Sequence, residues 1–241
     1  IGWNTQKENC MKLDFIDISR AFFQAMARRN VYVNLPEEDW SRGMCGRLNR
    51  AMYGMRDAAQ NWEYAYSEFM IESGFKWGAA FPCIFYHESR DIRIVVHGDD
   101  FTILGSRKQL DWYKSQIESK FDIKYKGRMG PNPEDMKSVR ILNRITTWTD
   151  SGIEYEPDQR HVDIIVEAMG LKEGKGVSTP TEDEKAWEEK GNDEELDFKR
   201  ATTCRKIGAR ANYLAQDRPD IMYSVKEICR QMSKPTVGGW K

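Results

Sequence analysis

The chain has 241 residues, of which 40% are hydrophobic and 31% charged, enough for a hydrophobic core in one or two domains. Its formal net charge of −1 provides no overall field for nucleic acid, although a neutral chain can still carry a local basic groove. The five scattered cysteines lack a Cys-x-x-Cys pair and there are only three histidines, which argues against a zinc site.

Hydrophobic periodicity predicts strands interleaved with helices. Residues 11–18, MKLDFIDI, alternate in polarity and predict a strand that ends before Ser19. The next predicted elements are a helix at 19–30, a strand at 31–38, a helix at 60–74 with Trp62, Tyr66, Phe69 and Met70 on one face, and strands at 82–87 and 91–97. They are followed by a helix at 106–121 that is capped by Ser106 and buries Leu110, Tyr113 and Ile117, strands near 122–126 and 139–148, a strand and helix within 152–170, and helices near 200–215 and 219–232. This mixture predicts an α+β fold in which helices cover one face of a largely antiparallel sheet.

The stretch VVHGDDFTILG, residues 95–105, predicts a strand–turn–strand hairpin with an acidic tip. Gly98 and Asp99 suit the two central positions of a tight turn, so turn chemistry alone explains the first aspartate. Asp100 adds a second carboxylate beside it, and neighbouring like charges raise each other's pKa unless a cation neutralises them. A hard divalent cation with oxygen ligands would do so.

A third carboxylate, Asp17, closes the first predicted strand just before a helix start, where exposed N–H groups can take phosphate oxygens. With Asp99 and Asp100 it would supply three oxygen ligands on neighbouring strands, the set that two-metal phosphoryl transfer needs. Asp14 is the rival. It lies inside the strand on the opposite face, and we interpret it as structural or solvent-facing.

Five stretches carry a family resemblance. They are DISRAFF (17–23), LNRAMYGMRDAAQNW (48–62), VVHGDDFTILG (95–105), GVSTP (176–180) and RPDIMYSVKEICRQMSKPT (218–236). Their order resembles that of copia-type retrotransposon reverse transcriptases over nearly the whole chain. The resemblance implies a right-hand polymerase fold: an α+β palm whose antiparallel sheet is covered by helices, partial fingers, and a thumb-like helical C-terminal region. It also implies an RNA-directed DNA polymerase with Mg²⁺, or Mn²⁺, as cofactor, acting on dNTPs and an RNA or DNA template with its primer.

The resemblance implies roles for individual residues. Asp17, Asp99 and Asp100 match the catalytic metal ligands, and Ile18 would lend a backbone carbonyl to a metal. The implied nucleotide-binding residues are Arg20 and Ala21 through their backbone N–H groups, Phe22 as the aromatic gate under the sugar, and Tyr53, Gly54 and Arg56. Without the resemblance, Phe22 would be interpreted as a core aromatic. Contacts to primer or template are implied for Gly98, Leu142 and Asn143.

Some positions depart from the family pattern. Gly98 replaces an aromatic or aliphatic residue before the aspartates, Ala59 replaces a proline, and Asn143 replaces a glycine near the primer strand. Basic residues gather in the sequence around the last of these positions, and they predict either contacts to nucleic-acid phosphates or a solvated face. These residues are Lys124, Lys126, Arg128, Lys137, Arg140 and Arg144.

We expect palm and partial fingers in residues 1–175, an acidic linker at 176–199, and a C-terminal thumb or connection region at 200–241. Residues 1–10 offer one lysine and cannot supply the family's basic finger hairpin, so we expect a fragment of a Pol polyprotein with little polymerase activity by itself. RNase H and integrase regions of the same polyprotein would be its flanking partners.

No signal peptide or long apolar run is present, which predicts an intracellular chain without a membrane partner. The resemblance implies a location in cytoplasmic virus-like particles, in the nucleus, or in both. The alternative to an enzyme is a catalytically inactive transposon remnant that folds or binds nucleic acid without polymerising.

Overall fold

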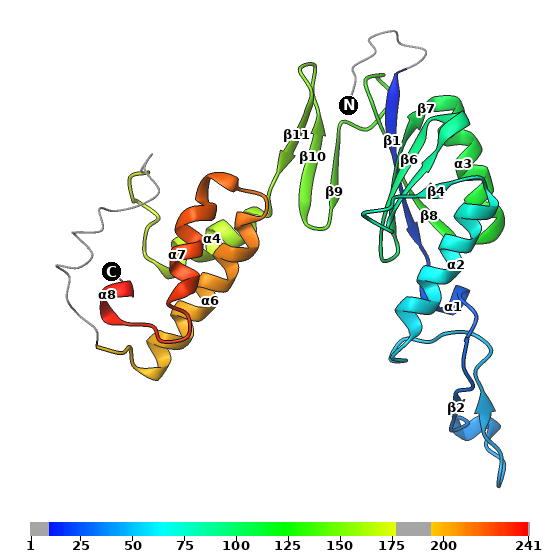
Figure 1. Cartoon of the computed structure of the whole chain (residues 1–241), viewed down its shortest axis with the longest axis horizontal. Coiled ribbons are helices and arrows are strands. Elements are labelled where there is room, and N and C mark those ends of the chain that lie inside the picture. Colours follow the sequence, from blue (N-terminus) through cyan, green and yellow to red (C-terminus); the bar gives the residue numbers. More distant parts are fainter. Residues whose placement is uncertain (1–9, 177–193, 241) are drawn as a thin grey trace. The chain divides into compact units, whose positions relative to one another are not determined.

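The computed structural model describes residues 10–176 and 194–240, which divide into two units by their internal contacts (Figure 1). The first unit holds residues 10–137 and 148–152, and the second holds residues 138–147 together with the described residues from 153 onward. The GVSTP stretch beyond Gly176 and most of the predicted acidic linker lie outside the described residues.

An antiparallel sheet of six strands forms the centre of the first unit, in the order β4-β5-β6-β7-β1-β8. Its strands are β1 (Met11–Ile18), β4 (Lys76–Trp77), β5 (Ile84–His87), β6 (Ile92–His97), β7 (Asp100–Ser106) and β8 (Ile123–Met129). Strand β1 has the predicted bounds and lies between β7 and β8. The mixed architecture of antiparallel sheet and helices predicted from the sequence is therefore confirmed.

Helices α2 (Ala58–Glu72) and α3 (Arg107–Lys120) pack on this sheet and enclose the main hydrophobic core. The predicted apolar face of α2 is buried, as is that of α3. Ser106 stands at the N-cap position of α3 as predicted, but its side chain makes no capping hydrogen bond. The helix periodicity of 3.6 residues thus identified the buried faces correctly.

The helix predicted at 19–30 is wrong in length. Only α1 (Ala21–Gln24) forms, because the backbone turns extended at Ala25 and its carbonyl accepts a hydrogen bond from the N–H of Ala51. A ladder with residues 49–51 thus competes with helix continuation. The segment beyond contains only the short elements β2 (Tyr32–Val33), η1 (Glu37–Asp39) and β3 (Gly46–Arg47), and η2 (Glu88–Arg90) joins β5 to β6.

The second unit combines a three-stranded sheet, in the order β11-β10-β9, with packed helices. Its elements are β9 (Ser138–Ile141), β10 (Arg144–Trp148, whose last residue groups with the first unit), β11 (Ile153–Glu156), α4 (Gln159–Ala168), α6 (Phe198–Ala215), η3 (Pro219–Ile221), α7 (Met222–Arg230) and α8 (Val237–Trp240). Contacts group α4 with α6 and α7, whereas the sequence-based boundary at residue 175 assigns α4 to the palm. Among the described residues, no helix combines the length and apolar character needed to cross a membrane.

Candidate active site

Asp17 and Asp100 face each other on neighbouring strands, β1 and β7. The two strands pair antiparallel with these residues directly opposite. Opposed side chains leave the same face of a sheet with their Cβ atoms about 4.5–5.5 Å apart. Two carboxylates in this position repel each other unless a cation lies between them. The pairing register therefore creates a point of concentrated negative charge at the end of β1.

Lys126, on β8, supplies a cation at this point. Its Nζ lies 3.1 Å from Asp17 Oδ1 and 2.6 Å from Asp100 Oδ1. Partial burial lowers the pKa of the Lys126 ammonium, but hydrogen bonds and charge from Asp100 and Asp17 outweigh this effect, and the net shift raises the pKa above its ordinary value. The site thus consists of two carboxylates that share one ammonium.

The predicted acidic hairpin is present, and its turn is held from two directions. Gly98 has φ +64°, a left-handed conformation that glycine adopts without steric cost, which accounts for glycine at this position. The indole Nε1–H of Trp62 donates to the Gly98 carbonyl at 2.8 Å, and the N–H of Ile18 donates to the Asp99 carbonyl at 2.9 Å. Helix α2 and strand β1 together therefore fix the turn that precedes Asp100.

Two of the three predicted metal-binding carboxylates come together. Asp99 lies exposed in the turn, and its side chain takes no part in the Lys126 ion pairs. No group of three or more His, Cys, Asp or Glu side chains within residues 10–176 and 194–240 is arranged to hold a metal ion. Asp17 and Asp100 nevertheless fit a hard divalent cation, because carboxylate oxygens are its preferred ligands and one oxygen of each already converges on a single cation.

Asp14, the alternative to Asp17 in the same strand, is a structural residue. It is 1% exposed and accepts hydrogen bonds from Arg128 Nε at 2.7 Å and Nη2 at 2.8 Å. Arg128 also reaches Asp111 of α3, 2.8 Å away. The structural interpretation of Asp14 is therefore confirmed and the solvent-facing one is wrong, because a paired and buried carboxylate joins β1, β8 and α3.

Two residues predicted to contact the nucleotide lie against each other. The rings of Phe22 and Tyr53 have centroids 4.6 Å apart, and Phe23 meets the same tyrosine edge-on at 5.4 Å. Phe22 packs against the core, whereas Tyr53 is 50% exposed. Gly54 follows with φ +94°, a conformation strained for any other residue. The structure thus pairs these aromatic residues at the surface of the first unit.

The turn that joins β1 to α1 is braced by Gln24, a residue that the sequence reasoning missed. Gln24 Nε2 donates to the carbonyl of Ser19 at 2.6 Å, and its Oε1 accepts from the N–H of Asp122 at 2.8 Å. Arg20 has φ +50° and an exposed side chain, and buried Ala21 begins the helix. The only sequence signal for Gln24 is its place directly after DISRAFF, because its partners are non-local.

The hairpin tip formed by Leu142 and Asn143 belongs to the second unit. It is a two-residue turn between β9 and β10, with φ +48° at Leu142 and +66° at Asn143. Asparagine tolerates this left-handed conformation, whereas a bulky leucine pays about 1–2 kcal/mol for it. Leu142 is also 42% exposed. A strained and exposed apolar side chain at a hairpin tip is typical of a contact position.

Most of the six basic residues singled out in the sequence make contacts within the protein. Lys126 and Arg128 bind the aspartates described above, and Lys137 Nζ donates to the carbonyls of Gly130 and Asn132. Arg144 binds Asp217 at 2.8 Å and the Tyr213 hydroxyl at 3.0 Å. Within the described residues, Lys124 and Arg140 form no ion pair. Structural pairing thus explains four of the six residues.

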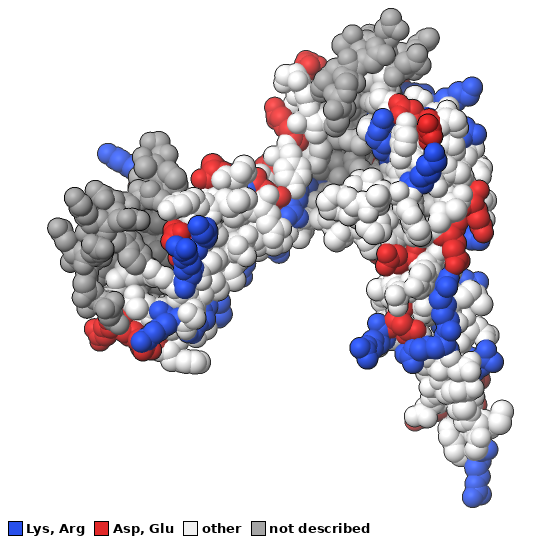
Figure 2. Space-filling view, in the orientation of Figure 1, with Lys and Arg blue, Asp and Glu red and all other residues white. Residues whose placement is uncertain are grey.

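An excess of arginine in residues 20–56 is a feature that the sequence reasoning overlooked. This range contains seven arginines, no lysine and three acidic residues. Every one of the arginines is exposed: Arg20, Arg28, Arg29, Arg42, Arg47, Arg50 and Arg56. Figure 2 shows basic side chains along the part of the first unit that runs from α1 to β2. Such a segment can contact a polyanion even though the net charge of the whole chain is close to zero.

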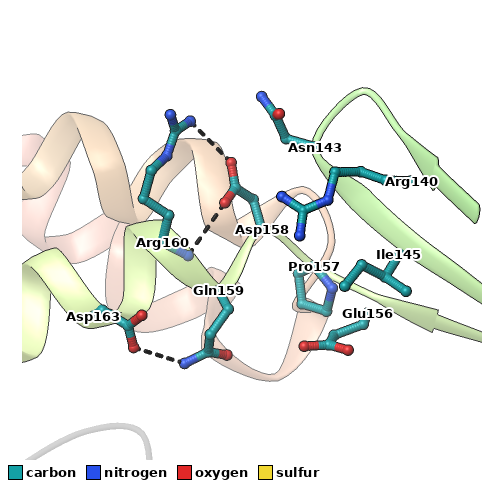
Figure 3. A pocket seen from close by; sticks show the side chains of 9 residues that line it. All are labelled: Arg140, Asn143, Ile145, Glu156, Pro157, Asp158, Gln159, Arg160 and Asp163. Carbon is teal, nitrogen blue, oxygen red and sulfur yellow. Dashed lines mark hydrogen bonds and ion pairs between the residues drawn. The ribbon is translucent and has the colours of Figure 1, made fainter.

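A pocket of about 250 Å³ lies in the second unit, between the β9–β10 hairpin and the start of α4 (Figure 3). Arg140 and Asn143 line one side, and Asp158 and Arg160 line the other. Asp158 caps α4 by accepting from the N–H of Arg160 at 3.2 Å and also binds the guanidinium of Arg160 at 3.0 Å. The Asp158 carboxylate is thus used in capping α4 and in pairing with Arg160.

The fold and the acidic hairpin define a mixed α/β domain with an aspartate pair at the ends of two adjacent antiparallel strands. A family model described as reverse transcriptase (RNA-dependent DNA polymerase) matches residues 5–183. The chain therefore belongs to the reverse transcriptase family, as the order of its motifs predicted. The aspartate pair, the paired aromatic residues and the whole antiparallel sheet of the first unit lie within this match.

Two curated relatives of the chain come from plant transposons. The chain is 24% identical over 249 residues to the retrovirus-related Pol polyprotein from transposon TNT 1-94 of Nicotiana tabacum, a match that covers 96% of the chain and 18% of the polyprotein. It is also 24% identical over 232 residues to the corresponding polyprotein from transposon RE2 of Arabidopsis thaliana, with coverage of 93% and 15%. The chain thus spans less than a fifth of the length of either relative.

Proposed function

We propose that this chain is the catalytic core of the RNA-directed DNA polymerase of a copia-type retrotransposon, extending a primer on an RNA or DNA template with dNTPs. The observation that carries the proposal is the Asp17–Asp100 pair, whose oxygens converge on one cation at the ends of two adjacent strands. Membership of the reverse transcriptase family supports it. Flanking RNase H and integrase regions, and location in cytoplasmic particles or the nucleus, belong to the same proposal.

In this proposal Asp17 and Asp100, with Asp99 as a third ligand and the Ile18 carbonyl as a fourth, hold Mg²⁺ or Mn²⁺. The bound ions supply a lowered pKa for the attacking hydroxyl and compensation for the charge of the transition state. The chain's own task is to keep the carboxylates aligned, and Trp62 does so by fixing the turn that precedes Asp100. Trp62, a buried residue of α2, therefore belongs to the site although it does not contact the metal ions in this proposal.

Substrate contacts are assigned by the same proposal. Phe22, backed by Tyr53, forms the floor under the sugar and excludes a 2′-hydroxyl, while the N–H groups of Arg20 and Ala21 receive the triphosphate. Gly54 and Arg56 contact the nucleotide or template next to Tyr53. The exposed tip at Leu142 and Asn143, together with the turn at Gly98, contacts the primer end.

The right-hand architecture is also part of the proposal. The six-stranded sheet with α2 and α3 serves as the palm, the arginine-rich segment from α1 to β3 as part of the fingers, and the helices of the second unit as a thumb. The arrangement of the sheet order and its covering helices supports the palm assignment. The domain limits expected from the sequence, at residues 175 and 199, stay predictions.

The test is primer extension on an RNA template with Mg²⁺ or Mn²⁺, using this chain and the chain extended upstream in its own reading frame. Asp100→Asn removes one charged ligand while keeping its size, and we expect extension to fall by about 10²-fold or more, the scale of a lost electrostatic contact in a transition state. The matched control is Asp91→Asn at the other end of β6, because Asp91 has φ +51°, which asparagine tolerates.

Equal loss of extension in both variants would contradict the catalytic assignment. A second candidate function, nucleic-acid binding without chemistry, is favoured by the seven exposed arginines. Fluorescence anisotropy with a labelled primer–template separates the two. Tight binding by the wild-type protein without extension, in the short and the extended chain alike, would support the inactive remnant.

A further inference from the structure

Lys126 is the extra residue at an irregularity in the sheet. Strand β8 pairs with β1 so that Tyr125 lies opposite Ile16 and Gly127 lies opposite Phe15, which leaves Lys126 as an extra residue without a partner. This is a β-bulge, a feature that redirects a side chain and is common beside active sites. The bulge leaves Lys126 unpaired two residues after Lys124, which lies opposite Asp17, and from there its ammonium contacts the aspartates of both neighbouring strands.

The bulge is specified by its own sequence. Gly127 has φ +133°, which strains any other residue, and a Cβ atom on it would overlap the sulfur of Met136. Met136 is held there because its N–H donates to the Arg128 carbonyl at 2.8 Å. The glycine and the returning loop thus favour the irregular backbone next to Lys126.

The ammonium and a divalent cation compete for the same atoms. Lys126 Nζ is bound to Oδ1 of Asp17 and Oδ1 of Asp100, and all three side chains are between 26% and 34% exposed. Carboxylate oxygens are also the ligands that Mg²⁺ and Mn²⁺ prefer. The Lys126 ammonium thus occupies one oxygen of each carboxylate that a metal ion would use. A metal ion at that same point would be repelled by the ammonium, so the two compete for it.

We propose that Lys126 is the resident countercation of this site, and that a divalent metal ion binds by displacing its ammonium from Asp17 and Asp100. The inference rests on the proposed function, since it assumes that the aspartate pair is the metal site. Lys126 then acts as a positioning residue. In the metal-free protein it keeps two facing carboxylates from repelling each other, and it lowers the affinity of the free protein for metal.

The test is Mn²⁺ titration of the full chain, followed by the electron paramagnetic resonance signal of free Mn²⁺, without nucleic acid or dNTP. We compare the wild-type protein with Lys126→Met, with Lys124→Met and with Asp100→Asn. Lys124 is the matched control: it lies on the same strand opposite Asp17 in register, is exposed, and makes no ion pair within the part of the chain that the structure describes. The Lys124→Met variant therefore measures how much Mn²⁺ affinity changes when a nearby positive charge is removed without breaking an ion pair to the aspartates.

We expect Lys126→Met to bind Mn²⁺ at least tenfold more tightly than the wild-type protein, and Lys124→Met to stay within about twofold. Thermal unfolding in EDTA is a second readout. Lys126→Met should melt at a lower temperature than Lys124→Met, and added Mn²⁺ should remove that difference. If the methionine variant does not fold, Lys126→Gln serves instead, because it keeps a polar head without the charge.

The outcomes separate this inference from the proposed function. Wild-type binding that is lost in Asp100→Asn but is unchanged or weakened in Lys126→Met would overturn the inference and leave the metal site intact. Binding that appears only in Lys126→Met would support the inference most strongly, since the lysine then masks the site. Absence of Mn²⁺ binding in all variants would overturn both the inference and the proposed metal site.

Discussion

Replacing Trp62 with phenylalanine tests whether α2 holds the acidic turn in place. Trp62 is 2% exposed and packs edge-on against Phe121, Tyr66 and Phe101, with ring centroids 5.1, 5.5 and 6.5 Å away. Phenylalanine keeps an aromatic ring in this cluster but removes the Nε1–H that donates to the Gly98 carbonyl. The substitution therefore releases the turn without taking away the aromatic character of the core.

The expected cost comes from two contributions. Gly98 is exposed, so water can replace the indole as donor, and the lost hydrogen bond costs about 0.5–1.5 kcal/mol. Removing part of a large ring from a fully packed position adds about 1–2 kcal/mol. We expect Trp62→Phe to lower the free energy of unfolding by about 2–3 kcal/mol, measured by urea denaturation, and to speed amide hydrogen exchange at residues 98–100.

Trp112→Phe is the control for the loss of ring atoms. Trp112 lies on α3, is half-buried, and its indole nitrogen makes no hydrogen bond within the described residues. We expect this variant to cost less than about 1 kcal/mol, because little packed volume is lost. If Trp62→Phe cost no more than the control, or if exchange at residues 98–100 stayed unchanged, the Trp62 hydrogen bond would not be what holds the turn.

Two further predictions concern the sheet and its core. Gly127→Ala should lower the free energy of unfolding by at least about 1–3 kcal/mol in thermal denaturation, because alanine is strained at φ +133° and its methyl group would displace Met136; an unchanged midpoint would argue against the bulge. Burial raises the pKa of both Tyr66 and Tyr125 to about 12. Below pH 10 the two tyrosines are protonated in the folded and in the unfolded protein, and their contribution to the free energy of unfolding is complete. It is lost as the pH rises from 10 through 12, because the unfolded chain then loses these protons first. Absorbance of tyrosinate, compared in Tyr66→Phe and Tyr125→Phe, checks this, and titration of both residues near pH 10 in the folded protein would contradict it.

Local periodicity predicted much of the first unit from the sequence. The sequence of the strand at 11–18 largely alternates in polarity, and α2 repeats apolar residues with helical spacing, so both were found with nearly the observed bounds. The acidic turn was predictable for a similar reason, because Gly98 and Asp99 suit a tight turn by their own conformational preferences. Signals of this kind depend only on neighbouring residues.

Non-local pairing explains what the sequence did not predict. The helix expected from residue 19 stops at Gln24 because the next residues form hydrogen bonds with residues 49–51. No pattern among neighbouring residues predicts this pairing. The ion pairs of Lys126 join three strands that are distant in the sequence, β8, β1 and β7, and so depend on how these strands pair. From the sequence alone, Lys126 was one of six basic residues with equal claims to a phosphate contact.

A buried ion pair joins β1, the strand that carries Asp17, to the loop that contains Met136. Lys12 Nζ lies 2.6 Å from Asp135 Oδ2, and both side chains are 2% exposed. Such a pair contributes little net stability, because removing two charges from water offsets most of their attraction. Its clear effect is positional: it fastens the loop that contains Met136, which packs against Gly127 of the bulge, to the same strand that carries Asp17. The strand that carries Asp17 is thus held near both of its ends, by the buried pair with Asp135 at one end and by the hydrogen bond from Ile18 to the acidic turn at the other.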